Sequence, residues 1–264
     1  MHHIFVKKDY VDLNNRIITI STLDDYDNYN HLVKSLRIKV GEKVLCSIIP
    51  FLSTYDYKTV VQDVSVDAII LSIEEEVSTS ELPISINLYQ GVCKADKLEF
   101  VIEKAVELGV NTITPFETEF CVAKIDKKDK RFAAKMERFN KISKAAAEQS
   151  KRHIIPEVLE PITIDSALAK VKNDYNIVFY ENAMDIDYTR KVINDLKEEI
   201  YNTHDKDENV PVNIFVGPEG GFNEKEVNLM KEAGFHVLTL GKRVLRTETA
   251  AITALSILMY EFEK

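Results

Sequence analysis

The stretch Leu240–Ala251 reads LGKRVLRTETAA, and an earlier stretch at Gly217–Phe222 reads GPEGGF. The earlier stretch follows the apolar run Val212–Val216, which is typical of a buried parallel strand. After it, Asn223 and Glu226 have the spacing of a capping box, which predicts the start of a helix. The first loop is therefore expected to join a strand to a helix.

The later stretch has the same arrangement. It follows a strand predicted over Val237–Leu240 and leads into a strongly apolar helix predicted over Ala250–Phe262. Open α/β folds bind their ligands at loops that follow the carboxyl ends of neighbouring parallel strands. We therefore expect the two loops to form one binding site at an edge of a sheet.

Together with three other segments, these loops resemble the small-subunit ribosomal RNA uridine-N3 methyltransferases of the RsmE family, a branch of the knotted SPOUT methyltransferases. The other segments are HLVKSLR at 31–37 followed by VGE at 40–42, KADKLEFVIEKAVELGV at 94–110, and EQSKR at 148–152 ahead of IPEV at 155–158. The resemblance covers nearly the whole chain. Its specific part is the pair of loops, because a short glycine motif such as GPEGG also matches by accident.

The resemblance implies an α/β protein with a small N-terminal PUA-like β barrel at 1–73 that binds RNA and a SPOUT methyltransferase domain at 74–264. It implies that the last third of the chain threads through a loop to form a trefoil knot. It also implies S-adenosylmethionine as the cofactor, N3 of a specific uridine in 16S ribosomal RNA as the target, and a homodimer. The order of elements alone predicts an ordinary doubly wound domain, since knots are rare.

The N-terminal pattern agrees with a small β barrel, because short β-branched runs recur at hairpin-like intervals. These runs are Arg16–Ile20, Lys43–Ile49, Lys58–Val66 and Ala68–Ile73. The segment 24–40 is expected to be helical, and the acidic, polar segment Glu74–Ser80 is the expected linker. Where relatives have a short turn, this chain has the aromatic segment 50–57, in which Phe51, Tyr55 and Tyr57 either stack on bases or pack within a hairpin.

From Ile84 onward, strands alternate with helices, which predicts a parallel sheet covered on both faces. Expected strands are Ile84–Gln90, Thr112–Pro115 and Asn176–Tyr180, and expected helices are 96–108, 129–150, 162–172 and 188–201. Residues 202–209 are predicted to form a charged surface loop.

Composition limits the class of protein. Cys46, Cys93 and Cys121 are isolated, so the sequence predicts neither a disulfide framework nor a metal site. No apolar run is long enough to cross a bilayer, and the first residues lack the features of a signal peptide. We therefore expect a cytoplasmic protein without a membrane partner.

Charge is distributed unevenly along the chain. The formal net charge is -9, which argues against indiscriminate coating of nucleic acid, whereas residues 124–152 carry an excess of about seven positive charges. A local basic face on an acidic protein favours a selective RNA partner, either free 16S RNA or the assembled small subunit. An ordinary solvated helix surface explains the same run equally well.

Glycine-containing loops such as these two expose their main-chain groups, which suits a cofactor such as S-adenosylmethionine. Main-chain groups can hold its adenine while its sulfonium faces the substrate. The residues predicted to hold the cofactor are Tyr180, Val216, Gly217, Gly221, Leu240, Gly241, Val244, Leu245 and Thr249. Taken alone, GPEGG also fits a tight strand-to-helix turn, and a tyrosine at a strand end also fits ordinary packing.

Arg246 and Glu248 are the predicted catalytic residues. N3 of uridine carries a proton, so its methylation requires a base or donors that stabilise charge on the neighbouring carbonyl oxygens. Arg246 suits the donor role, and Glu248 is a candidate base. Capping and ion pairing at the start of the terminal helix are the alternative roles, mainly for Glu248.

Six basic or titratable residues are candidate RNA contacts: His31, Arg37, Lys94, Lys97, Lys151 and Arg152. Each alone is as well explained as a solvated side chain or, for His31, as a structural histidine. The target uridine must be unpaired or extruded, because N3 lies on its Watson–Crick edge.

Two other functions stay open at this point. A non-catalytic RNA-binding or ribosome assembly factor would keep the barrel without binding the cofactor. A different α/β enzyme that holds a dinucleotide through GPEGG is disfavoured, because the spacing is not G-x-G-x-x-G.

Overall fold

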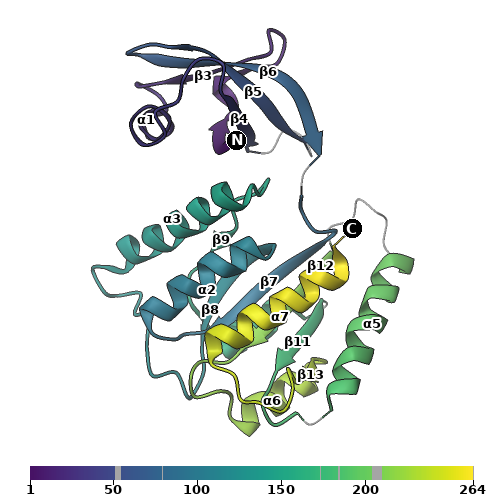
Figure 1. Ribbon diagram of the computed structural model, residues 1–264. Coiled ribbons are helices and arrows are strands. Elements are labelled where there is room, and N and C mark those ends of the chain that lie inside the picture. The colour runs from purple at the N-terminus through teal and green to yellow at the C-terminus, as the bar shows by residue number, and fades with distance from the viewer. Residues whose placement is uncertain (51–54, 79, 173, 184, 204–209, 264) are drawn as a thin grey trace. The chain divides into compact units, whose positions relative to one another are not determined.

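The computed structural model describes residues 1–50, 55–78, 80–172, 174–183, 185–203 and 210–263 (Figure 1). The chain forms two compact units. The first comprises Met1–Glu81 with Glu148–Ile154, and the second comprises Leu82–Ala147 with Ile155–Lys264. We call them the half-barrel unit and the sheet unit.

The half-barrel unit is one curled six-stranded sheet whose strands follow the order β1-β4-β5-β6-β3-β2 (Figure 1). Its strands are β1 (His2–Lys7), β2 (Val11–Asp12), β3 (Ile17–Ser21), β4 (Lys43–Ile49), β5 (Tyr55–Val64) and β6 (Ala68–Ser78). A 3-10 turn η1 (Lys8–Tyr10), the helix α1 (Tyr26–Asn30) and the π-helical turn η2 (His31–Ser35) complete it. Alternate β-branched side chains of the strands point inward and form the core.

Several N-terminal expectations need correction. The linker expected over Glu74–Ser80 is wrong for its first five residues, since β6 continues to Ser78 in register with β5. The boundary expected after residue 73 therefore falls inside a strand. The helix expected over 24–40 is limited to α1 and η2, and β1, which pairs in parallel with β4, was not expected at all.

The aromatic segment 50–57 separates into different environments. Tyr57 lies in the half-barrel core and is 3% exposed, which confirms packing for that residue, whereas Tyr55 is 45% exposed. Phe51 lies outside the described residues.

Arg152, predicted as an RNA contact, is instead buried inside the half-barrel unit. Its Nε donates to both carboxylate oxygens of Glu81 at 3.0 Å, and the next residue, His153, places Nδ1 2.8 Å from Asp56 Oδ1. Asp56 in turn accepts a hydrogen bond from Ser47. Arg152 is 4% exposed, so the prediction of a surface contact is wrong for this residue.

The sheet unit contains a seven-stranded parallel sheet with the order β10-β8-β7-β12-β11-β13, and β9 pairs with β8. Its strands are β7 (Ile84–Gly91), β8 (Val110–Glu117), β9 (Glu157–Val158), β10 (Ile162–Thr163), β11 (Tyr175–Phe179), β12 (Val210–Val216) and β13 (His236–Leu238). The central strands are nearly continuous apolar runs, as expected for strands buried on both faces.

Helices cover both faces of this sheet (Figure 1). They are α2 (Ala95–Glu107), α3 (Phe132–Ser150), α4 (Ile164–Lys170), α5 (Ile186–Thr203), α6 (Glu224–Glu232) and α7 (Thr247–Phe262). The helices α4 and α6 bury Ala167, Val227 and Met230 against Phe116 and Phe215 on one face. α2 and α7 pack side by side over the other face (Figure 1).

The sequence predicted these elements with small shifts at their ends. The helix expected over 162–172 begins as the short strand β10, and α3 starts at Phe132 rather than at 129. Of the surface loop expected over 202–209, residues 204–209 lie outside the described residues.

A partly buried polar ladder crosses the sheet. Thr112 donates to Asn87 at 2.8 Å, Asn87 donates to Asn213 at 3.1 Å, and Asn213 donates to Asn176 at 2.9 Å. Because each of these strands contributes one rung, the ladder favours a single strand order and register.

Three strands end level at one edge of the sheet. Phe179 of β11 is in register with Val216 of β12 on one side and with Leu238 of β13 on the other. The loops that follow β12 and β13 therefore flank the end of β11.

Candidate functional site

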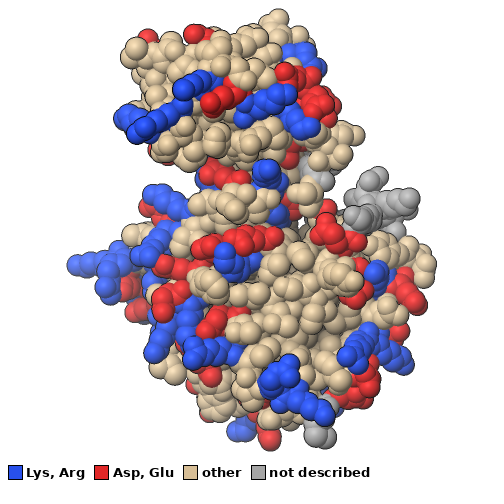
Figure 2. Space-filling model, viewed as in Figure 1, with Lys and Arg blue, Asp and Glu red and all other residues tan. Residues whose placement is uncertain are grey.

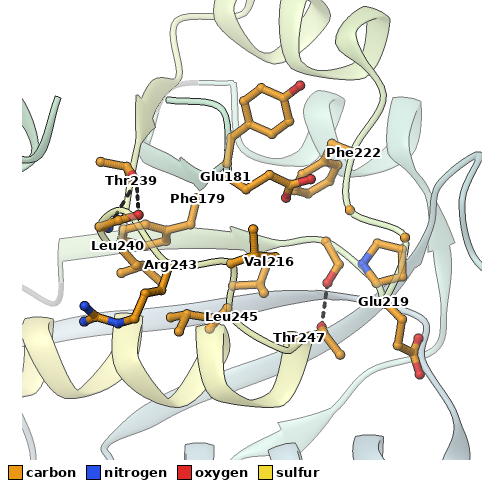
Figure 3. A pocket seen from close by; sticks show the side chains of 18 residues that line it. Phe179, Glu181, Val216, Glu219, Phe222, Thr239, Leu240, Arg243, Leu245 and Thr247 are labelled. Carbon is orange, nitrogen blue, oxygen red and sulfur yellow. Dashed lines mark hydrogen bonds between the residues drawn. The ribbon is translucent and has the colours of Figure 1, made fainter. Parts of the chain in front are cut away.

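A pocket in the sheet unit lies between the loops that follow β12 and β13 (Figure 3). It encloses about 660 Å³ of space, part of it open to solvent. The first loop contributes Gly217–Phe222, the second contributes Thr239–Leu245 except Lys242, and Phe179, Tyr180 and Glu181 lie between them. The two loops therefore line one pocket at the sheet edge, which is the arrangement expected from the sequence.

All residues predicted to hold the cofactor line this pocket except Thr249, which is exposed in the first turn of α7. The same turn instead contributes Thr247 and Ala250. Thr249 therefore does not line the pocket, and the cofactor contact predicted for it stays a prediction.

The GPEGG loop depends on glycines because backbones approach closely. A Cβ on Gly91, at the end of β7, would lie 2.4 Å from the nitrogen of Pro218. A Cβ on Gly217 would lie 3.1 Å from the backbone of Gly221, which itself has a φ of +70°. The loop is therefore folded back on itself against β7 in a form that side chains would not permit.

Thr247 ties the start of α7 to this loop (Figure 3). Its hydroxyl donates to the carbonyl oxygen of Gly217 at 2.6 Å and accepts from Nε2 of Gln90 at 2.8 Å. All three residues are buried. One hydroxyl thus joins the ends of β7 and β12 to the terminal helix.

The far side of the GPEGG loop is held by the predicted capping box. Asn223 accepts from the backbone N–H of Glu226 at 2.7 Å, and Glu226 accepts from the backbone N–H of Asn223 at 3.0 Å. Glu226 also accepts from the backbone N–H of Glu119 at 2.8 Å, and the Asn223 amide donates to the Glu119 carboxylate. The cap therefore anchors the loop after β8 as well as the helix.

The second loop is shaped by two threonines. The N–H of Gly241 donates to Thr239 Oγ1 at 3.2 Å, and Gly241 has a φ of +116° (Figure 3). The backbone N–H and C=O of Thr239 both bond the hydroxyl of Thr189 in α5, at 3.1 and 3.0 Å. This turn leaves Leu240 and Leu245 beside the pocket as an apolar wall (Figure 3).

Lys97 lies between two carboxylates beside the GPEGG loop. Its Nζ is 3.2 Å from Glu219 Oε1 and 3.8 Å from Glu248 Oε2. The hydrogen bond to Glu219 raises the pKa of Lys97 above its ordinary value, and the nearby charge of Glu248 adds to this. Lys97 is therefore a charged partner of the predicted base.

Glu219 has competing influences on its pKa. Burial alone would raise the pKa, but hydrogen bonds from the backbone N–H groups of Glu219 itself and of Lys94, together with Lys97, leave it below its ordinary value. Glu248 Oε2 is buried and accepts no hydrogen bond from any described residue. The Glu219 carboxylate is therefore favoured in its ionised form.

Arg246 directly precedes α7 as its N-cap residue, with an extended backbone and an exposed side chain. Its carbonyl accepts the N–H of Ala250 at 2.8 Å. The guanidinium forms no ion pair with a carboxylate of the described residues. Arg246 is thus a charged group near the pocket that is available to a ligand.

The remaining RNA-contact candidates lie on different units. Lys94 is exposed at the N-cap of α2 in the sheet unit, whereas His31, Arg37 and Lys151 are exposed in the half-barrel unit. Arg37 and Lys151 both have positive φ, at 53° and 58°, which places them at sharp turns.

The basic stretch 124–152 is partly neutralised. On the face shown in Figure 2, Lys and Arg gather where α2 and α3 lie, with acidic side chains among them. Several pair directly with carboxylates: Lys127 with Glu160, Arg131 with Asp129, Arg138 with Glu99, and Lys141 with Glu137. The surface is basic but less so than the sequence count indicates.

Several pocket residues were not predicted from the sequence, namely Phe179, Glu181, Pro218, Glu219, Phe222, Thr239, Arg243, Thr247 and Ala250. Most of them adjoin residues that were predicted, so extending each loop by one or two positions would have found them. Glu181 follows β11 directly, and the rule that ligands bind at strand ends could have indicated it.

Other chemistries find no support in this region. Burial raises the pKa of the neighbouring Cys93 thiol to about 12, so it is a poor nucleophile. Over the described ranges, no group of His, Cys, Asp and Glu is arranged to hold a metal ion. Within the same ranges, no helix has both the length and the apolar character of a membrane span.

Comparisons with known proteins agree with this geometry. The sequence model of the RNA methyltransferase domain family matches residues 80–259, and that of the RNA methyltransferase PUA domain matches residues 23–48. Ribosomal RNA small subunit methyltransferase E of Bacillus subtilis (strain 168) is 33% identical over 242 residues, which cover 90% of this chain and 89% of the relative.

Two solved structures resemble the whole chain. A ribosomal RNA small subunit methyltransferase E from Neisseria gonorrhoeae, bound to S-adenosyl methionine, is 26% identical with a TM-score of 0.75, and the match covers 98% of this chain and 97% of that chain. A Legionella pneumophila protein in complex with the bound cofactor SAM is 29% identical with a TM-score of 0.76, covering 98% and 96%.

Proposed function

The chain belongs to the RsmE family of ribosomal RNA small subunit methyltransferases, and from this premise we propose that it methylates N3 of a specific uridine in 16S ribosomal RNA with S-adenosylmethionine. The observation that carries the proposal is the pocket between the loops that follow β12 and β13. Its walls are backbone and apolar side chains, and charged residues gather at the start of α7.

The pocket suits an adenosyl ligand. Its lining combines apolar side chains with glycines, and the glycines of the first loop leave main-chain groups accessible. Leu240, Val244 and Leu245 would pack against adenine while the backbone of the second loop pairs with its edge. When bound, S-adenosylmethionine supplies a methyl group activated by the positive charge on its sulfur.

The chain's own residues would prepare the nucleophile. Arg246 would donate to a uracil carbonyl oxygen and stabilise the negative charge that develops as N3 loses its proton. Glu248 is the candidate acceptor for that proton, and Lys97 Nζ lies 3.8 Å from its Oε2. Transfer of the methyl group to N3 would leave neutral 3-methyluridine and S-adenosylhomocysteine.

RNA would be held by exposed basic residues of both units. Lys94 in the sheet unit and His31, Arg37 and Lys151 in the half-barrel unit are the candidates, whereas Arg152 is excluded by its burial. Contacts of this kind position the backbone, and selection of the uridine depends on its unpaired Watson–Crick edge.

We also infer a homodimer and a knotted chain path, as in SPOUT relatives. The supporting feature of the dimer is the outward side of α7, where Ile252, Ile257 and Tyr260 are partly or fully exposed. The face of α7 seen in Figure 2 carries few charges. An apolar, sparsely charged helix face is typical of a surface that another chain covers.

The experiment is methyl transfer followed by mapping. The protein is incubated with S-adenosylmethionine labelled in its methyl group and with small-subunit RNA, either free or as assembled subunits, and the RNA is digested to nucleosides. Label in 3-methyluridine is expected, and large-subunit RNA serves as the control substrate. Label at carbon 5 or on ribose would contradict the N3 assignment.

The same material tests the non-catalytic alternative. Calorimetry with S-adenosylmethionine should show saturable binding to one site per chain. Absence of binding, combined with retained affinity for small-subunit RNA, would instead identify an assembly factor.

A further inference from the structure

Glu181 is the residue at the middle of the pocket's three strand ends. It follows β11, which lies between β12 and β13 in the sheet, and the loops after those two strands form the walls of the pocket. Figure 3 shows its side chain reaching toward Phe222. Its Oε1 lies 2.9 Å from where a Cβ on Gly221 would be.

This carboxylate differs from the other acidic groups nearby. Glu219 accepts a hydrogen bond from the Lys94 backbone and pairs with Lys97, and Glu248 also lies near Lys97. Glu181 forms no hydrogen bond or ion pair with any residue that the structure describes, although it lines the pocket. An acidic side chain in this position has both oxygens available to a ligand.

The order of the strands decides which part of the ligand Glu181 would meet. The apolar slot of Leu240 and Leu245 follows β13, and the charged residues of the reaction lie by the GPEGG loop after β12. A ligand with adenine in the slot and sulfur near those charges must cross the end of β11. The part of S-adenosylmethionine between adenine and sulfur is its ribose.

We propose that Glu181 binds the ribose of S-adenosylmethionine by accepting hydrogen bonds from its 2′ and 3′ hydroxyls. Two vicinal hydroxyl donors match the two oxygens of one carboxylate, and bonds to a charged acceptor are the stronger kind. The proposal rests on the proposed function, since it assigns one contact within the same pocket. Glu181 is a binding residue, and no step of proton transfer passes through it.

Calorimetry with three probes separates the possibilities. S-adenosylhomocysteine carries adenine, ribose and the amino acid, 5′-methylthioadenosine lacks the amino acid, and 2′-deoxy-5′-methylthioadenosine also lacks one hydroxyl. Each is titrated into the whole protein, into Glu181→Ala and into Glu232→Ala. Glu232 is an exposed glutamate on α6 outside the pocket, so its variant controls for loss of one negative charge.

Glu181→Ala should lower the affinity for S-adenosylhomocysteine and for 5′-methylthioadenosine by the same factor. The expected factor is about tenfold to a hundredfold, which is the range for hydrogen bonds to a charged group. Loss of the 2′ hydroxyl should weaken binding to the unaltered protein and have little further effect in Glu181→Ala, as coupled partners require. Glu232→Ala should bind all three probes normally. Thermal unfolding of each variant reports whether the fold is intact.

Two results would overturn the assignment. If Glu181→Ala binds all probes with unchanged affinity, Glu181 does not contact the ligand. If the variant binds S-adenosylhomocysteine more weakly but 5′-methylthioadenosine normally, Glu181 contacts the amino group of the ligand instead of its ribose. If the unaltered protein binds none of the probes, the proposed function fails first, and the ribose assignment fails with it.

Discussion

Gly91 and Pro218 approach so closely that a Cβ on Gly91 would lie 2.4 Å from the Pro218 nitrogen. The end of β7 and the GPEGG loop are therefore in backbone contact. This contact fixes the height of the loop above the sheet, and with it one wall of the pocket.

Gly91→Ala is expected to displace the GPEGG loop. The added methyl group meets backbone atoms rather than a flexible side chain, so the expected cost is about 1–3 kcal/mol of stability, as for overpacked cores. Affinity for S-adenosylhomocysteine should fall as well. Chemical denaturation and calorimetry measure the two effects, and a variant with normal stability and affinity would show that the loop is not held by this contact.

Thr247→Ala should destabilise the protein by about 1–3 kcal/mol, because the carbonyl of Gly217 and the amide of Gln90 lose their shared partner in a buried place. Thr247→Ser keeps the hydroxyl and should recover most of the loss. Thr249→Ala, an exposed position in the same helical turn, is the matched control and should change stability by less than about 0.5 kcal/mol. Equal effects of the two alanine variants would contradict the role of the buried hydroxyl.

Arg246→Ala should lower kcat by about a hundredfold, the scale for removal of one donor to a developing anion. Affinity for S-adenosylhomocysteine should stay normal, since Arg246 does not line the pocket. Lys242→Ala removes an exposed positive charge from the same loop and should keep most activity. Near-normal turnover by the Arg246 variant would remove its catalytic assignment.

Lys97→Met should alter the dependence of stability on pH. The pKa of Glu219 is below its ordinary value, so its contribution is present above about pH 4.5 and is lost as the pH falls through its lower folded value. The pKa of Lys97 is raised, so its contribution is present below 10.5 and is lost at more alkaline pH.

Between these limits the wild-type protein should be more stable than Lys97→Met. The difference should shrink as the pH falls below 4.5 and Glu219 takes up its proton, and again in strong alkali as Lys97 loses its proton. Denaturation curves from pH 3 to 11 measure it. A difference that is constant across this range would mean that Lys97 acts through packing rather than charge.

Tyr260→Glu should dissociate the proposed homodimer, because it places a charge on the outward face of α7, where Tyr260 is 78% exposed. Leu229→Glu introduces the same change at a partly exposed position of α6 and should leave the dimer intact. Light scattering coupled to size-exclusion chromatography reports the mass. A monomeric wild-type protein would contradict the dimer.

The sequence alone predicted most helices and strands of the sheet unit. Apolar runs such as Val212–Val216 are long and bounded by turn residues, and the pair Asn223 and Glu226 signals its helix locally. The half-barrel was harder to predict. Strand β1 pairs with β4 more than thirty residues away, and β6 extends through acidic residues whose partners are Lys43 on β4 and Lys58 on β5.

The site was predictable where its signal is local and not where it depends on distant pairing. Glycines and leucines of the two loops stand out in the sequence. The burial of Arg152 depends on Glu81, which is 71 residues earlier, and the requirement for glycine at 91 depends on Pro218. Glu181 has no distinguishing neighbours in sequence, and only the position of β11 between two loop-bearing strands indicates its role.

The half-barrel unit is not expected to fold from its N-terminal segment alone. Its own N-terminal segment ends at Glu81, yet the groups that satisfy the carboxylates of Glu81 and Asp56 are Arg152 and His153, which arrive much later in the chain. A fragment that ends at Glu81 would keep the buried Asp56 but lose its partner His153. A buried carboxylate that has lost its partner strongly disfavours folding. Any transplant of this unit onto another enzyme, in the laboratory or by recombination, must therefore take residues 148–154 with it.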